Sequence, residues 1–220
     1  MAKSGDSVFA HKALYFDPYV SKLQYENRRE TKNLLLHISL LVIYILLIML
    51  LSLISHVLFI ISNGATLVAF EAGLYVAAGA WLGLYSVLVV YIATLLSNIL
   101  ILKIPFQLAV INSLTSPLEA LGVMLLIRTG LIDSSLEKIQ DWLLFAAVQF
   151  LVVVPSAFLY VEINAYFSYW PHVWENLGFE LLLRIIISHM AGGVLFGGLL
   201  IMWFTEILKK KGLYFSHFLT

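Results

Sequence analysis

The chain has 220 residues, of which 61% are hydrophobic and 12% are charged, and its formal net charge is zero. An ordinary soluble domain is about half apolar and about a quarter charged, so this composition indicates an integral membrane protein. The neutral balance gives no support for nucleic acid as a partner. The lack of cysteine excludes disulfides, thiolate nucleophiles and cysteine-bound metals.

Residues 1–33 form a polar N-terminal segment ahead of the first apolar run. Basic residues are interleaved there with aromatic ones. This mixture is typical of a cytoplasmic segment that lies against membrane lipids, and a solvated leader fits it equally well. A cleavable signal peptide is not expected, because the apolar run starts late and is too long for a signal sequence.

Six apolar segments follow, each near or above the ~20 residues that a helix needs to cross a bilayer. They are residues 34–61, 65–83, 84–102, 106–128, 142–167 and 181–208. No polar loop marks the division at Gly83. An unbroken helix of roughly 38 residues, however, would be about twice as long as the hydrocarbon core is thick. We therefore predict an all-α, polytopic membrane protein with a bundle of six transmembrane helices over residues 34–208.

The placement of basic residues predicts the orientation of this bundle. Lysine and arginine are concentrated in residues 1–33 and in residues 209–220, whereas Lys103 stands alone in the third connection. Because basic segments stay on the cytoplasmic side, both ends should be inside, and we expect a multi-pass protein of the cell membrane. The fifth connection would be outside. Its aromatic residues are typical of an interfacial belt and could alternatively gate a ligand site; they are Tyr169, Trp170, Trp174 and Phe179.

The fourth apolar segment carries a polar stretch, NSLTSPLEAL, at residues 112–121. Asn112, either Thr115 or Ser116, and Glu119 are spaced so that they share one helix face. Lipid cannot satisfy their hydrogen bonds, so this face must meet other helices or a water-filled cavity. Bonding between helices would explain the amide and the hydroxyls, whereas a carboxyl needs a cation, a proton or a ligand.

Ionisable residues elsewhere in the predicted spans are candidates for function, because hydrocarbon makes them costly. Glu71 in the second span could pair with Arg184 or His189 in the sixth, or stay protonated. His189 precedes Gly193 and Gly197, whose spacing predicts close backbone packing of the last helix against a neighbour. The predicted ligand-binding set is Glu71, Asn112, Thr115, Ser116, Glu119, Arg184 and His189.

The sequence offers little support for catalysis or for a bound metal. A metal site built from Glu71, Glu119 and His189 is conceivable, but no short ligand-spacing motif supports it, and no cofactor is expected. No GxSxG, P-loop or HExxH pattern occurs. The chain is therefore expected to be a binding protein, with an intramembrane enzyme as an alternative.

Residues 63–128 and the last apolar segment resemble the membrane-associated sensor domains of the MASE type. Gly73 and Leu74 match that family's Trp-Pro-Pro-x-Gly-Leu element, with Glu71 where proline is usual, and Asn98 matches the end of the next helix. The Gly-Asn-Thr-x-Glu-Ala helix closed by Leu-Leu-x-Arg is matched, with extra residues between Asn112 and Glu119, by Asn112, Glu119, Ala120 and Arg128. SHMAGGVLF resembles the late Gly-Asp-x-x-Gly element, with His189 in place of the aspartate.

Such domains are best known at the N-termini of bacterial histidine kinases and diguanylate cyclases. The resemblance implies a membrane sensor that binds a small ligand. Because only residues 209–220 follow the last predicted span, we expect it to signal through a partner protein. Six helices in about 200 residues also resemble the substrate-binding membrane subunit of energy-coupling-factor transporters. An accessory subunit of a larger membrane complex is a further alternative.

Overall fold

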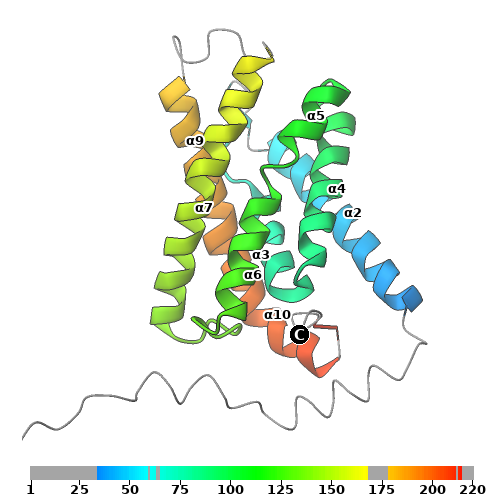
Figure 1. Ribbon diagram of the computed structural model, residues 1–220, viewed down its shortest axis with the longest axis vertical. Helices are drawn as coiled ribbons and strands as arrows, with labels where there is room; N and C mark the ends of the chain where they lie inside the picture. Colours follow the sequence, from blue (N-terminus) through cyan, green and yellow to red (C-terminus); the bar gives the residue numbers. More distant parts are fainter. Residues whose placement is uncertain (1–33, 59, 63–64, 168–177, 212, 215–220) are drawn as a thin grey trace, which may run out of the picture. The chain divides into compact units, whose positions relative to one another are not determined.

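A computed structural model describes residues 34–58, 60–62, 65–167, 178–211 and 213–214 (Figure 1). The chain divides into two units between Ser39 and Leu40, and the second contains the candidate functional site. Tyr169, Trp170 and Trp174 of the predicted aromatic belt lie outside the described residues, as does the polar segment 1–33.

The described elements are helices and one short antiparallel hairpin, in which Ile60 pairs with Thr66. In chain order they are α2 (Leu34–Leu58), β1 (Ile60–Ser62), β2 (Ala65–Thr66), α3 (Phe70–Leu82), α4 (Tyr85–Leu100), α5 (Phe106–Asn112), α6 (Pro117–Arg128), α7 (Ile139–Tyr166), α9 (Gly178–Met190), the π-helix η2 (Ala191–Gly197) and α10 (Gly198–Lys210).

Within the described residues, four helical stretches are long and apolar enough to cross a membrane. They are Ile38–Val57, Phe106–Arg128, Ile139–Tyr166 and Gly178–Lys210. The segments predicted as the second and third spans form shorter helices, α3 with 13 residues and α4 with 16. The predicted division at Gly83 is present, and its φ of 57° is a backbone conformation that glycine adopts readily.

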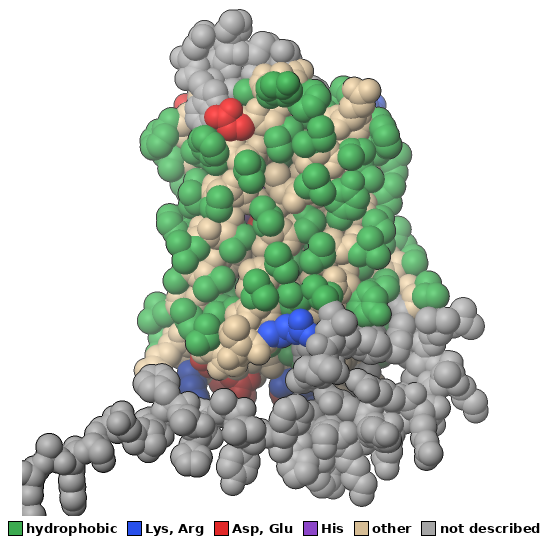
Figure 2. All heavy atoms as spheres, viewed as in Figure 1, with side chains coloured by type: hydrophobic (Ala, Val, Ile, Leu, Met, Phe, Trp, Pro, Cys, Tyr) green, Lys and Arg blue, Asp and Glu red, His purple; other side chains and the backbone are tan. Residues whose placement is uncertain are grey.

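The surface of the second unit carries a broad apolar region. Figure 2 shows hydrophobic side chains over the middle of the viewed face, with charged side chains gathered towards its two ends. On α2, Leu46 is 58% exposed and Leu50 is 51% exposed. Apolar surface of this extent is unfavourable in water and suits contact with lipid chains, as expected for a membrane protein.

The predicted fourth span is broken in the middle, where residues 113–116 form a turn between α5 and α6. Pro117 is the first residue of α6, a position where its missing N–H is harmless. Hydroxyls satisfy the carbonyls near the break: Ser113 Oγ donates to Ala109 O at 2.6 Å, and Ser156 Oγ on α7 donates to Thr115 O at 2.9 Å. The break therefore ties α6 to its neighbour α7.

Glycines hold α3 against the last helix, backbone to backbone, but the packed pair is Gly192 and Gly197 and not the predicted Gly193 and Gly197. A Cβ built on Gly73 would lie 2.8 Å from Gly192 O and 2.9 Å from Gly197 N, closer than real contacts allow. The glycines that face α3 are five residues apart, because the wider turn of η2 brings positions i and i+5 together. Gly193 instead lies against side chains, Gln149 of α7 and Val76 of α3.

Candidate functional site

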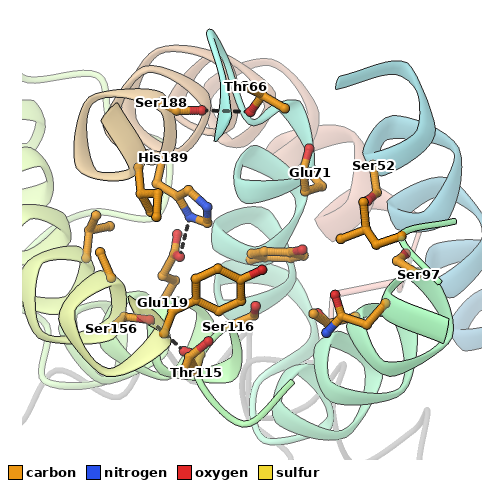
Figure 3. Close-up of a pocket in the computed structure, with 18 of the residues that line it drawn as sticks. Ser52, Thr66, Glu71, Ser97, Thr115, Ser116, Glu119, Ser156, Ser188 and His189 are labelled. Carbon is orange, nitrogen blue, oxygen red and sulfur yellow. Dashed lines mark hydrogen bonds and ion pairs between the residues drawn. The ribbon is translucent and has the colours of Figure 1, made fainter. Parts of the chain in front are cut away.

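A polar cavity of about 120 Å³ lies among α2, α3, α4, α6, α7 and α9 (Figure 3). Serine and threonine hydroxyls from most of these helices line it, together with carboxyl, imidazole and phenol groups. A polar cavity of this size has room for several water molecules or one small polar ligand. Its composition contrasts with the apolar exterior of the same helices.

Glu119 and His189 form the central contact of the cavity, and Figure 3 shows them pointing toward each other from α6 and α9. His189 Nδ1 lies 2.7 Å from Glu119 Oε1. Glu119 is only 1% exposed, and its other oxygen, Oε2, has no hydrogen-bond partner among the described residues. Glu119 lies in the first turn of α6, where the helix dipole favours a negative charge. A residue that lines the cavity therefore carries a carboxyl oxygen with no donor among the described residues.

Glu71 is the second carboxyl of the cavity and lies on the side of α2, near Ser52 in Figure 3. Ser55 Oγ on α2 donates to Glu71 Oε2 at 2.5 Å and accepts from the Phe70 backbone N–H at 3.0 Å. Glu71 lines the same cavity as Glu119 and His189. The two carboxyl groups thus belong to one electrostatic site.

The chain segments that lead into Glu71 and His189 are bonded to each other. The Ala69 backbone N–H donates to Ser188 O at 3.2 Å, and the hydroxyls of Thr66 and Ser188 are 3.0 Å apart. A Cβ on Gly192 would collide with the Ala69 carbonyl. These contacts hold the start of α3 and the end of α9 in one register, so the positions of Glu71 and His189 are coupled.

Five of the seven residues predicted as ligand-binding line this cavity: Glu71, Thr115, Ser116, Glu119 and His189. Two do not. Arg184 bonds to Glu180 one turn earlier on α9 and is not among the described residues that line the cavity.

Asn112 is the second exception, and it points to another helix. Asn112 and Asn164 of α7 exchange side-chain amide hydrogen bonds at 3.2 and 3.3 Å, and both are buried. Asn112 therefore has the interhelical bonding role that the sequence left open.

Sequence reasoning missed the hydroxyls that the other helices contribute. Ser52 on α2, Thr94 and Ser97 on α4, and Ser156 on α7 all line the cavity. Ser97 Oγ is buried and has no hydrogen-bond partner among the described residues. The spacing of Thr94, Ser97 and Asn98 along one helix face was a usable signal, but it does not say what that face meets.

The described residues contain no group of three histidine or acidic side chains placed to hold a metal ion. No family model matches the chain, and neither a curated protein nor a solved structure matches it. The resemblance to membrane-associated sensor domains therefore stays a prediction.

Proposed function

We propose that the protein is an integral membrane receptor, which binds a small polar ligand in this cavity and passes its state to a partner protein. The proposal rests on the burial and bonding of Glu119: one of its oxygens is bonded to His189, and the other has no donor within the part of the chain that the structure describes. A buried carboxyl without its full set of partners is unfavourable, and such groups in membrane proteins commonly mark functional sites.

We propose a six-crossing topology in the cell membrane, with both ends in the cytoplasm. Successive elements alternate in direction: α2, α3, α4, α5 with α6, α7, and α9 with α10 (Figure 1). Residues bordering the cavity include His56 near the end of α2 and Leu181 near the start of α9, which is the predicted outer end of both helices. In this topology the ligand would enter from outside.

Binding is favoured over catalysis by the surroundings of the histidine. A carboxyl–imidazole pair can activate a hydroxyl nucleophile only when that hydroxyl lies within hydrogen-bond reach of the imidazole. His189 is bonded to Glu119, and no serine or threonine hydroxyl in the described part of the chain is bonded to it. The proposal therefore gives the pair a role in ligand recognition.

A sensor fits better than a subunit of an energy-coupling-factor transporter. The transporter interpretation used the glycine-rich face of the last helix as a docking surface for a coupling protein. That face is occupied within the fold, because Gly192 and Gly197 pack on α3 and Gly198 packs on Trp142 of α7. The partner of the proposed sensor would instead meet the cytoplasmic side, where Lys209, Lys210 and Lys211 lie in the proposed topology.

The proposal is tested by measuring thermal unfolding of the full chain in lipid nanodiscs against a panel of small polar metabolites. Ala157 lines the cavity on α7, so Ala157→Leu fills it, whereas Ala147→Leu makes the same change at an exposed position of that helix. We expect at least one compound to raise the Tm of wild type and Ala147→Leu, but not of Ala157→Leu. The proposal is wrong if no compound does so, or if the filled variant responds equally.

A further inference from the structure

We propose that the cavity selects a small organic cation that carries N–H donors, namely a protonated amine, over neutral or anionic molecules of the same size. This inference rests on the proposed function, since it names the ligand class of that same site. It depends on the charges in the cavity and on the two polar atoms that lack partners there.

The charge of the cavity favours a cation. Glu71 and Glu119 both line it, and no lysine or arginine is among the described residues that do so. When both carboxyls are ionised, protonation of His189 offsets one carboxylate and leaves the other. Inside a membrane bundle the effective dielectric constant is low, so an uncompensated carboxylate attracts a cation and repels an anion far more strongly than it would in water.

The unpartnered atoms favour a cation that donates hydrogen bonds. Glu119 Oε2 accepts only, and Ser97 Oγ can accept as well as donate; both atoms are buried without a partner among the described residues. A primary ammonium group offers three donors and no acceptor, so it can bond to a carboxylate and to neighbouring hydroxyls at once. A quaternary ammonium has the same charge but no donor and would leave Glu119 Oε2 unsatisfied.

Tyr75 of α3 adds an aromatic ring to the lining of the cavity, and its side chain is 4% exposed. An aromatic ring attracts a nearby ammonium group through the negative face of its π-system, and this attraction is stronger when the cation is desolvated. Carboxyl groups, hydroxyls and an aromatic ring together match an amine better than they match a neutral sugar or a carboxylic acid.

The inference is tested with three probes of one chain length: 4-aminobutan-1-ol, butane-1,4-diol and 4-hydroxybutanoate. Their affinities for the full chain in nanodiscs are measured by calorimetry or ligand-observed NMR at neutral pH and one ionic strength. We expect the amine to bind about tenfold or more tightly than the diol, because a hydrogen bond to a charged group replaces a neutral one. The acid should bind more weakly than the diol.

Variants then assign this preference to the carboxyl groups. Glu119→Gln should weaken amine binding by about tenfold to hundredfold and leave diol binding within about twofold. Glu71→Gln, which removes the other charge, should also weaken amine binding. Glu206→Gln on α10 is the matched control, because Glu206 bonds to Lys209 outside the cavity, and it should bind all three probes as wild type does.

The outcomes separate this inference from the proposed function. Equal or tighter binding of the diol or the acid to wild type would overturn the amine preference and leave a ligand-binding cavity. If none of the three probes binds while another compound still stabilises wild type but not Ala157→Leu, the amine inference is wrong and the proposed function stands. If no compound binds at all, both fail. The probe comparison on wild type needs no variant to fold.

Discussion

Glu119 on α6 and His189 on α9 are 70 residues apart in the sequence, and a 2.7 Å hydrogen bond joins them inside the bundle. The contact connects the polar stretch of the broken fourth span with the residue that directly precedes Met190 and the π-helix η2. It places a titratable pair at the junction of the cavity and the glycine packing of α3, so both stability and recognition should depend on it.

The first prediction concerns the coupling between these two residues. His189→Gln leaves Glu119 buried with neither oxygen bonded to an imidazole, so this change should destabilise the protein. Adding Glu119→Gln to the His189→Gln variant should cost less stability than His189→Gln costs in the wild type. A double-mutant cycle should give a coupling energy of about 1–3 kcal/mol, measured by unfolding in mixed detergent micelles.

His56→Gln is the matched control, because it removes the other imidazole of the cavity without touching the bond to Glu119. Its cycle with Glu119→Gln should show a smaller coupling. Additive effects of Glu119→Gln and His189→Gln would show that the hydrogen bond contributes nothing to folding.

The second prediction separates helix packing from ligand binding. Asn112→Ala removes one half of the buried amide pair and leaves Asn164 without two of its bonds, so it should destabilise the fold by about 1–2 kcal/mol. Asn112 does not line the cavity among the described residues, so affinity for any ligand found in the metabolite panel should change by less than about twofold. Lost affinity in a variant that still folds would place Asn112 in the binding site after all.

The third prediction tests the register of the π-helix. Gly192→Ala would drive a methyl group into the Ala69 backbone carbonyl, which cannot move without shifting α3. Gly193→Ala would meet the Gln149 amide at 3.3 Å and Val76 Cγ2 at 3.4 Å, which are side-chain atoms that can adjust. Overpacking typically destabilises by about 1–3 kcal/mol, so Gly192→Ala should fall at or above that range and Gly193→Ala below it.

The ranking of these two glycine variants is read from the midpoints of unfolding in the same detergent. In an ordinary α-helix the predicted pair Gly193 and Gly197 would lie on the packed face, and the ranking of the two variants would be reversed. Greater damage from Gly193→Ala would therefore contradict the π-helical register.

The fourth prediction tests the proposed topology, and the chain suits this test because it contains no cysteine. Single cysteines at Leu84, Lys103 and Lys211 occupy exposed positions near the ends of helices. With six crossings and both ends inside, a membrane-impermeant maleimide added to intact cells should label Lys103→Cys only. The other two should react after the membrane is permeabilised.

Labelling of Leu84→Cys in intact cells would show that the connection between α3 and α4 is outside. In that case α3 and α4 would not cross the membrane in the way we propose. Labelling of Lys211→Cys from outside would reverse the orientation of the C-terminal end.

The polar stretch NSLTSPLEAL shows which neighbours helical spacing predicts correctly and which it does not. It placed Thr115, Ser116 and Glu119 together, and all three line the cavity. It also placed Asn112 on their face, but the turn at residues 113–116 interrupts the helix, and Asn112 pairs with Asn164 instead. Periodicity assumes an unbroken helix, so it fails across the break that Pro117 helps to make.

Several features of this protein follow from the amino-acid sequence without its fold. They are apolar helices suited to a membrane, a division at Gly83, close packing of the last helix at glycine, and energetically costly polar residues inside the spans. Each follows from the hydropathy or backbone freedom of individual residues. The tertiary structure alone decided that Glu119 meets His189, that Arg184 stays with Glu180, and that hydroxyls from α2, α4 and α7 join one cavity. Those pairings depend on how each helix is rotated and on the register of η2, which come from packing between segments distant in the sequence.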